Sequence, residues 1–284
     1  MRLFRTSLLI LALALPAGGA FAELKLPRVS QNSTIKQTVG LTDITVTYSR
    51  PGVKGRVIWG ELVPYDQPWR TGANEATTIT LSEDVMIGGT KLAAGSYALL
   101  TIPGKEEWQV VVNKDKDMWG SNGYKAESDL VRIKVKPTAA EHMEWMAFGF
   151  ENLTFNSADL VLRWEKLRLA IPITNDDLEQ VVTNAKAEVA AAKPDDWRAP
   201  YRAANFMFDA SLEPALTAEW AKKSAAIEGN YQTLTLMAKI AAKDGKTKDA
   251  IAHAEKAIKA GKESKEKVDT SGTEKLLSQW TAKP

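Results

Sequence analysis

The chain has 284 residues, of which 25% are charged and 44% are hydrophobic, and it contains no cysteine. This composition is typical of a globular protein long enough for one large or two small domains. The missing cysteines exclude thiol nucleophiles and thiolate metal sites. Residues 23–173 and residues 174–284 each contain equal numbers of basic and acidic residues. Neither part has the basic excess that binding to nucleic acid or anionic lipid requires, so we expect no nucleic-acid partner.

The first 22 residues have the three regions of a secretory signal peptide. Arg2 and Arg5 form a basic start, residues 7–15 (SLLILALAL) are apolar, and residues 20–22 (AFA) form an A-x-A cleavage site. The apolar run is too short for a bilayer core of about 30 Å, which disfavours the alternative of a retained membrane anchor. We expect cleavage after Ala22 and no transmembrane segment in the mature chain. Export without disulfides indicates a periplasmic or secreted bacterial protein.

Between residues 40 and 173, apolar and polar side chains alternate, which is the period of half-buried β-strands. A Gly88-Gly89 pair between two short apolar runs predicts a tight hairpin. Eight to ten short strands with no helical period between them predict an antiparallel sandwich or barrel, and we favour a jelly-roll-like β-sandwich over residues 23–173. The alternating residues are Ile44, Val46 and Tyr48; Ile79 and Leu81; Trp108, Val110 and Val112; Val131, Ile133 and Val135; Leu160, Leu162 and Trp164; and Leu167, Leu169, Ile171 and Ile173.

From residue 174 the pattern becomes helical, which predicts an all-helical domain over residues 174–284. Thr174 or Asn175 is suited to cap a first helix that ends before Pro194, and further helices begin near Trp197 and after Pro214. Residues 231–243 and 247–260 form a predicted pair of helices, and a short helix follows around residues 276–280.

The predicted pair of helices resembles one tetratricopeptide repeat, and a weaker copy precedes it at residues 203–227. Small residues at the packing positions allow two helices to approach closely. A generic helical hairpin is the alternative, because such arrays need about three repeats for stability. The packing positions are Leu234, Ala238, Gly245, Ala250, Ala254 and Ala257.

Residues 49–78 form a long segment without periodicity inside the β region, and such segments are uncommon unless they bind something or pack on themselves. Its arginines suit carboxylates or phosphates, and its aromatic rings offer stacking faces to a sugar or a peptide. The alternative is that the aromatic residues close the open end of the sandwich, with the arginines paired to Glu61, Asp66 or Glu75. The candidate binding residues are Arg50, Arg56, Trp59, Tyr65, Trp69, Arg70, Asn74 and Glu75.

The same segment resembles the most characteristic motif of the bacterial family called domain of unknown function 2911. The matching runs include SRP at residues 49–51, IWG at 58–60, LVPY at 62–65 and WRTGANEAT at 69–77. The similarity continues to LAAGSY at residues 92–97 and covers residues 28–173. Members of this family are typically exported bacterial proteins, often with helical repeats after the β domain. The resemblance therefore implies a fold, a compartment and a domain layout, but no activity.

Motifs for known catalytic or metal chemistry are missing from the sequence. The two histidines, His142 and His253, have no partner at metal-binding spacing, and there is no nucleophile elbow and no phosphate-binding loop. Residues 113–117 (NKDKD) are spaced like a calcium loop but lack its glycine and its closing glutamate, so we interpret them as a solvated turn. We expect no metal and no cofactor.

Together these patterns predict a non-enzymatic binding or interaction protein of the bacterial envelope. We expect it to bind a small polar ligand, a glycan or an envelope protein through residues 49–78 and the helical tail. One alternative is a hydrolase of an envelope polymer that uses Glu75 with Asp66 or Glu61, because glycosidases need two carboxylates. Another is a purely structural assembly factor.

Overall fold

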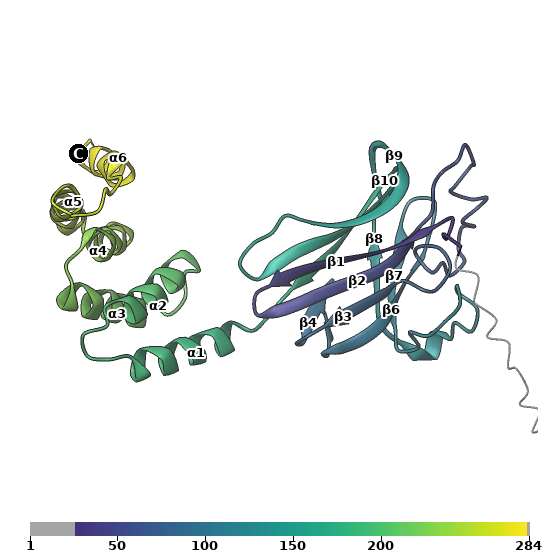
Figure 1. The fold of residues 1–284 in the computed structure, drawn as a ribbon, viewed down its shortest axis with the longest axis horizontal. Coiled ribbons are helices and arrows are strands. Elements are labelled where there is room, and N and C mark those ends of the chain that lie inside the picture. The colour runs from purple at the N-terminus through teal and green to yellow at the C-terminus, as the bar shows by residue number, and fades with distance from the viewer. Residues whose placement is uncertain (1–25, 283–284) are drawn as a thin grey trace, which may run out of the picture.

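The computed structural model describes residues 26–282 and shows a β domain followed by a helical domain (Figure 1). Two antiparallel sheets of six and four strands form the β domain, and six helices follow them. The predicted signal peptide lies outside the described residues. Within residues 26–282, no helix has the length and apolar character needed to cross a bilayer.

The larger sheet has the strand order β1-β2-β3-β6-β7-β8, and the smaller sheet has the order β5-β4-β10-β9. Neighbouring strands in both sheets are antiparallel. The strands are β1 (Gln31–Val39), β2 (Thr42–Arg50), β3 (Thr78–Leu81), β4 (Val85–Ile87), β5 (Thr90–Leu92), β6 (Gly95–Ile102), β7 (Trp108–Asn113), β8 (Asp129–Val135), β9 (Thr138–Glu151) and β10 (Ser157–Thr174).

One hydrophobic core fills the space between the two sheets. Ile44 and Val46 of β2 and Val110 of β7 pack in the same cluster as Leu160 and Leu162 of β10, and all five are fully buried. Each such side chain contributes about 1.5–3 kcal/mol on burial, so this core dominates the stability of the domain. The predicted antiparallel β-sandwich is confirmed.

The last strand differs from its prediction, because the sequence pattern indicated two strands where the structure has the single strand β10. Glu165 adopts a left-handed φ of 54°, and the pairing with β9 shifts register on either side of it. From Arg163 to Leu167, β10 advances four residues while β9 advances eight, from Ala147 to Ala139, so the extra residues are in β9. This irregular pairing and the left-handed Glu165 accompany a change in the alternation of β10. Trp164 before this irregularity and Leu169 after it are therefore both buried.

The predicted hairpin at Gly88-Gly89 is confirmed, since it joins β4 to β5 with Ile87 paired to Thr90. Both glycines have positive φ, 55° and 83°, as a two-residue turn of this kind requires. A Cβ on Gly88 would also lie 2.5 Å from the Cδ1 atom of Ile133, so this position has no room for a side chain.

The helical domain begins where the strand β10 ends, and its consecutive helices pack against one another (Figure 1). The predicted range 231–243 is confirmed as α4, and α5 extends two residues beyond its prediction. The helices are α1 (Leu178–Ala191), α2 (Arg198–Asp209), α3 (Pro214–Ile227), α4 (Tyr231–Lys243), α5 (Thr247–Lys262) and α6 (Ser271–Thr281).

The predicted cap of the first helix is wrong, because α1 begins at Leu178 with Asp177 at its N-cap position. Asn175 is instead buried against the β domain, where its Nδ2 group donates hydrogen bonds to the Val39 carbonyl and the Thr42 hydroxyl. Its Oδ1 atom accepts from the backbone N–H of Asp177 at 2.9 Å. The Asn175 side chain therefore fastens the start of the helical domain to the turn between β1 and β2.

Candidate functional site

A pocket of about 450 Å³ lies among the residues that follow β2, and we call it the free-end pocket. Strand β2 runs from Thr42, beside the attachment of the helical domain, to Arg50, and the lining begins at Pro51. The pocket is therefore at the end of the sandwich away from α1. Most of its wall comes from residues 51–74, and Val29, Ser30, Ser121 and Trp164 complete it.

Three cationic side chains line the free-end pocket: Lys54, Arg56 and Arg70. Within residues 26–282, no Asp or Glu lines it, and none of the three cations forms an ion pair. Arg56 is held by main-chain carbonyls, since its Nε donates to Val53 at 3.1 Å and its Nη2 to Gly52 at 2.6 Å. This wall of the pocket is therefore positively charged.

Arg70 is half-buried, and its buried Nε atom has no hydrogen-bond partner in the described part of the chain. Burial lowers the pKa of this guanidinium below its ordinary value, although an arginine remains protonated. Gly120 packs on it so closely that an added Cβ would lie 2.7 Å from the Nη1 atom of Arg70. The charge is thus partly removed from water without a protein anion to compensate for it.

Four tryptophans form a cluster beneath the free-end pocket: Trp59, Trp69, Trp108 and Trp164. The rings of Trp69 and Trp164 are stacked with centroids 5.8 Å apart, and Trp59 meets Trp108 edge to face at 4.8 Å. Trp69 and Trp164 line the pocket, whereas Trp59 does not. The aromatic residues of the loop therefore close the end of the sandwich, as the alternative interpretation of the sequence expected, and two of the rings also form pocket wall.

The other polar candidates of the loop are divided between the pocket and the scaffold. Asn74 lines the pocket, and its Nδ2 group donates to the Ser30 carbonyl at 3.1 Å and the Ser49 hydroxyl at 3.2 Å. Arg50 is outside the lining, where its Nε donates to the Met146 carbonyl at 2.7 Å. Tyr65 is also outside the lining and packs on Gly60.

The three carboxylates of the hydrolase alternative do not meet in the free-end pocket. Glu75 pairs with Arg28, which donates to both carboxylate oxygens at 2.7 Å. These bonds, and then the hydrogen bond to the backbone of Glu75, lower the pKa of its carboxyl, whereas a general acid needs a raised pKa. Glu61 and Asp66 are exposed and lie outside the lining.

The structure therefore brings together Arg56, Trp69, Arg70 and Asn74 from the predicted set and leaves the other four candidates outside the lining. Sequence reasoning missed Lys54, although it lies in the same aperiodic segment beside Arg56. It also missed Ser30, Ser121 and Trp164, because these residues are distant in sequence and reach the pocket only through the tertiary fold.

A family model described as "Protein of unknown function (DUF2911)" matches residues 30–173, just over half of the chain. The chain belongs to this family. Its match begins two residues after the start of the resemblance expected from the sequence and ends at the same residue. No curated protein matches the chain, and no solved structure matches it.

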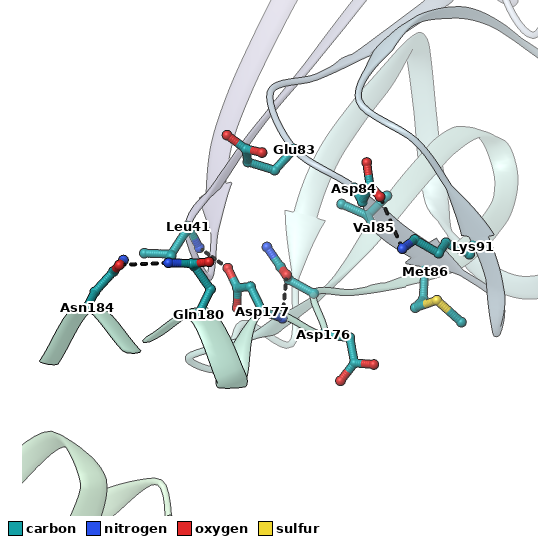
Figure 2. A pocket seen from close by; sticks show the side chains of 11 residues that line it. Leu41, Glu83, Asp84, Val85, Met86, Lys91, Asp176, Asp177, Gln180 and Asn184 are labelled. Atoms are coloured by element: carbon teal, nitrogen blue, oxygen red, sulfur yellow. Dashed lines mark hydrogen bonds and ion pairs between the residues drawn. The ribbon is translucent and has the colours of Figure 1, made fainter. Parts of the chain in front are cut away.

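A second pocket, of about 720 Å³, lies where the DUF2911 domain meets α1, and we call it the junction pocket (Figure 2). Four carboxylates line it, from Glu83 and Asp84 in the DUF2911 domain and from Asp176 and Asp177 in the segment that enters α1. Lys91 is the one cation among its described lining residues, and it pairs with Asp84 at 3.1 Å.

The carboxylates of the junction pocket also hold main-chain groups. Asp84 accepts the Ala94 N–H at 3.0 Å, and this bond, followed by the one from Lys91, lowers the pKa of its carboxyl. Asp177 accepts the Leu41 N–H at 2.9 Å, a hydrogen bond that joins the helical domain to the turn between β1 and β2 (Figure 2). No pattern in the sequence indicated this pocket.

Proposed function

We propose that the protein is a non-enzymatic binding protein of the bacterial envelope that takes a small anionic ligand into the free-end pocket. The observation that carries this proposal is the lining itself, in which Lys54, Arg56 and Arg70 face one pocket and no described lining residue is an acid. The carboxylate of Glu144 lies outside the lining and accepts the main-chain N–H of Lys54 at 2.9 Å. Arginine and lysine in this setting recognise carboxylates and phosphates.

Electrostatics support an anion as the missing partner. Three other arginines of the domain have acidic partners: Arg163 and Arg168 share Glu151, and Arg132 pairs with Asp129. Like charges that gather around one partly dehydrated pocket repel one another, and a bound anion relieves that repulsion. Main-chain carbonyls keep the charge of Arg56 at the pocket, and the buried Nε of Arg70 has no hydrogen bond within the described chain.

The size and the remaining lining support a small organic molecule. Ligand pockets typically enclose about 300–1,000 Å³ and combine apolar walls with a few polar groups, and 450 Å³ falls within this range. Trp69 and Trp164 supply apolar wall, while Gln67 and Asn74 supply amides. A pocket lined by cations with no carboxylate suits binding better than acid–base hydrolysis.

Calorimetric titration of the purified protein tests the proposal, with inorganic phosphate, succinate and galacturonic acid as probes at low salt. We expect binding that weakens as salt is raised. Arg70→Lys, which removes the planar fork, and Lys54→Gln, which removes a charge, should each weaken it by about tenfold. The matched control is Lys186→Gln, an exposed lysine of α1. Absence of binding by all three probes, or equal affinity in Lys54→Gln and Lys186→Gln, would refute an anion site.

We also propose that the chain is exported, with cleavage after Ala22, and acts in the periplasm or outside the cell. The basic start, the apolar run and the A-x-A site in the first 22 residues support this proposal. N-terminal sequencing of the protein recovered from a periplasmic fraction should give Glu23 as the first residue. A retained Met1 would contradict it.

We further propose that the helical domain is an interaction module of the tetratricopeptide-repeat type. Ala238 of α4 and Ala250, Ala254 and Ala257 of α5 are fully buried, as close packing of two helices requires. Gly245 in the connection has a φ of 76°, a conformation that favours glycine. The same arrangement of paired helices supports a role for this domain in binding an envelope protein.

A further inference from the structure

Trp119 is the most exposed aromatic side chain in the described part of the chain, with 62% of its surface accessible. An indole ring in water leaves a large apolar surface unburied, and an exposed aromatic beside a pocket is a common feature of binding sites. Trp119 belongs to the connection between β7 and β8, a segment that the proposed anion site uses only through Ser121.

The main chain holds Trp119 directly beside the free-end pocket. Trp119 forms an antiparallel bridge with Glu75, and the N–H of Gly120 donates to the carbonyl of Asn74 at 3.1 Å. Gly120 itself has a φ of 73° and lies against the guanidinium of Arg70. The exposed ring is therefore attached to the backbone that also places Arg70 and Asn74.

A second exposed tryptophan, Trp145 of β9, adjoins another part of the same pocket. It is 42% accessible and forms an antiparallel bridge with Gly52, which lines the pocket. The Nζ atom of Lys54 lies over its ring, 5.7 Å from the centroid. Each of the two exposed tryptophans thus lies next to one of the cations of the pocket.

We propose that the ligand of this site is a carboxylate-bearing glycan, longer than the pocket, with sugar rings stacked on Trp119 and Trp145. This inference rests on the proposed anion-binding function and specifies its ligand. The carboxylate would bind the cations, and Ser30, Gln67 and Ser121 offer hydroxyl and amide groups to sugar hydroxyls. An indole face complements the apolar C–H face of a sugar ring, while a single small anion would leave both rings unused.

The main chain of the site favours a glycan over an extended peptide. Peptides that add to a sheet need free main-chain donors and acceptors along an edge. Here the N–H groups of Val53, Trp69 and Ala76 already donate to the carbonyls of Glu144, Thr101 and Met118 at 2.7–3.0 Å. These three main-chain donors around the site are therefore not free to pair with a peptide strand.

The test compares chain lengths by calorimetric titration of the purified protein. The probes are galacturonic acid, tetrasaccharides of galacturonate, of mannuronate and of hyaluronan, neutral cellotetraose and tetraglutamate. We expect at least one acidic tetrasaccharide to bind about tenfold or more tightly than galacturonic acid and than cellotetraose.

The variant Trp119→Ala should remove most of this gain and leave the affinity for galacturonic acid unchanged, while Trp119→Phe should retain part of the gain. Trp145→Ala should act in the same direction as Trp119→Ala. The matched control is Phe155→Ala, because Phe155 is 44% exposed but lies between β9 and β10, at the other end of the domain.

Other outcomes would overturn the inference in distinguishable ways. If galacturonic acid binds but no tetrasaccharide binds more tightly, the anion site stands and the glycan is refuted. If tetraglutamate gains more than the tetrasaccharides and Trp119→Ala removes that gain, the ligand is an acidic peptide. If the protein is a dimer in sedimentation and Trp119→Ala dissociates it, the ring belongs to an interface. If neither galacturonic acid nor inorganic phosphate binds, the proposed function itself fails.

Discussion

The two ends of the β domain carry pockets of opposite charge. The free-end pocket has Lys54, Arg56 and Arg70 and no acid among its described lining residues, whereas the junction pocket has four acids and the single cation Lys91. The nine residues of β2 separate the two ends by about 30 Å, several times the Debye length of about 8 Å in physiological salt. The charges at one end are therefore screened from those at the other, and the equal numbers of acids and bases in residues 23–173 do not reveal this separation.

The two ends also differ in how their polar groups are bound within the protein. At the junction, Asp84 and Asp177 accept hydrogen bonds from the main chain, and Asn175 fastens the start of the helical domain to β1 and β2. At the free end, the Nε of Arg70 has no hydrogen bond within the described chain. The polar groups of the junction thus hold two domains together, whereas at the free end Arg56 and Asn74 are bound within the β domain.

The largest expected effect follows from removing the floor of the free-end pocket. Trp164 is 1% exposed and stacks on Trp69, so Trp164→Ala leaves a cavity in the core and should lower the free energy of unfolding by about 3–5 kcal/mol. Urea unfolding followed by circular dichroism measures this loss. Trp119→Ala is the matched control, and it should change stability by less than about 0.5 kcal/mol because its ring is exposed. Equal losses in the two variants would show that Trp119 also packs as core.

Trp164 illustrates what the sequence does and does not predict. The alternation of apolar and polar residues predicts that Trp164 lies on the buried face of a strand, because side chains of a strand point alternately to its two faces. The position of Trp164 beneath a pocket depends on residues 51–74, which fold back over the end of the sandwich. No periodic pattern in the sequence predicts the path of those residues. The irregular pairing at Glu165 was also not predicted, because a glutamate with a left-handed φ has no local sequence signature. Its trace in the sequence is the change in the phase of the apolar alternation between Trp164 and Leu167.

The site was predicted in part for the same reason. Aromatic and arginine density singled out residues 49–78, and Arg56, Trp69, Arg70 and Asn74 of that segment line the free-end pocket. Arg50 lies outside the lining because of a tertiary contact, the hydrogen bond from its Nε to the Met146 carbonyl of β9, which its sequence neighbours do not indicate. Charge totals were misleading for the junction pocket, because its acids come from two separate segments and are balanced by bases elsewhere.

The next largest effect should come from the junction. Asn175→Ala removes the buried amide that bonds to Val39 and Thr42, which leaves buried polar groups without partners and should lower the free energy of unfolding of the β domain by about 1–3 kcal/mol. Anion binding at the free end should stay unchanged, since the two pockets are remote. Thermal unfolding and phosphate titration of the same sample measure both. A parallel loss of affinity would show that the two ends are coupled.

Gly120→Ala should produce a smaller loss of stability together with a loss of binding. Alanine is strained at a φ of 73°, and its Cβ would push the guanidinium of Arg70 aside, so we expect about 1 kcal/mol of destabilisation and about tenfold weaker anion binding. Gly123→Ala is the matched control, because Gly123 has a similar φ of 84° but nothing within 4 Å of an added Cβ. It should destabilise the protein and leave the affinity intact. If both variants bind normally, the position of Arg70 does not depend on Gly120.

The smallest effect concerns the ion pair at the edge of the free-end pocket, and it depends on pH. Because the bonds from Arg28 lower the pKa of Glu75 in the folded protein, the pair stabilises the fold above the unfolded pKa of about 4.5, and this contribution is lost as the pH falls further. Both side chains are about half exposed, so solvent screening limits the contribution to less than about 1 kcal/mol. Glu75→Gln should therefore be slightly less stable than the natural chain at pH 7, and the difference should shrink as the pH falls below 4.5. A difference that does not shrink as the carboxyl becomes protonated would mean that Glu75 acts through its packing beside Trp119 and not through its charge.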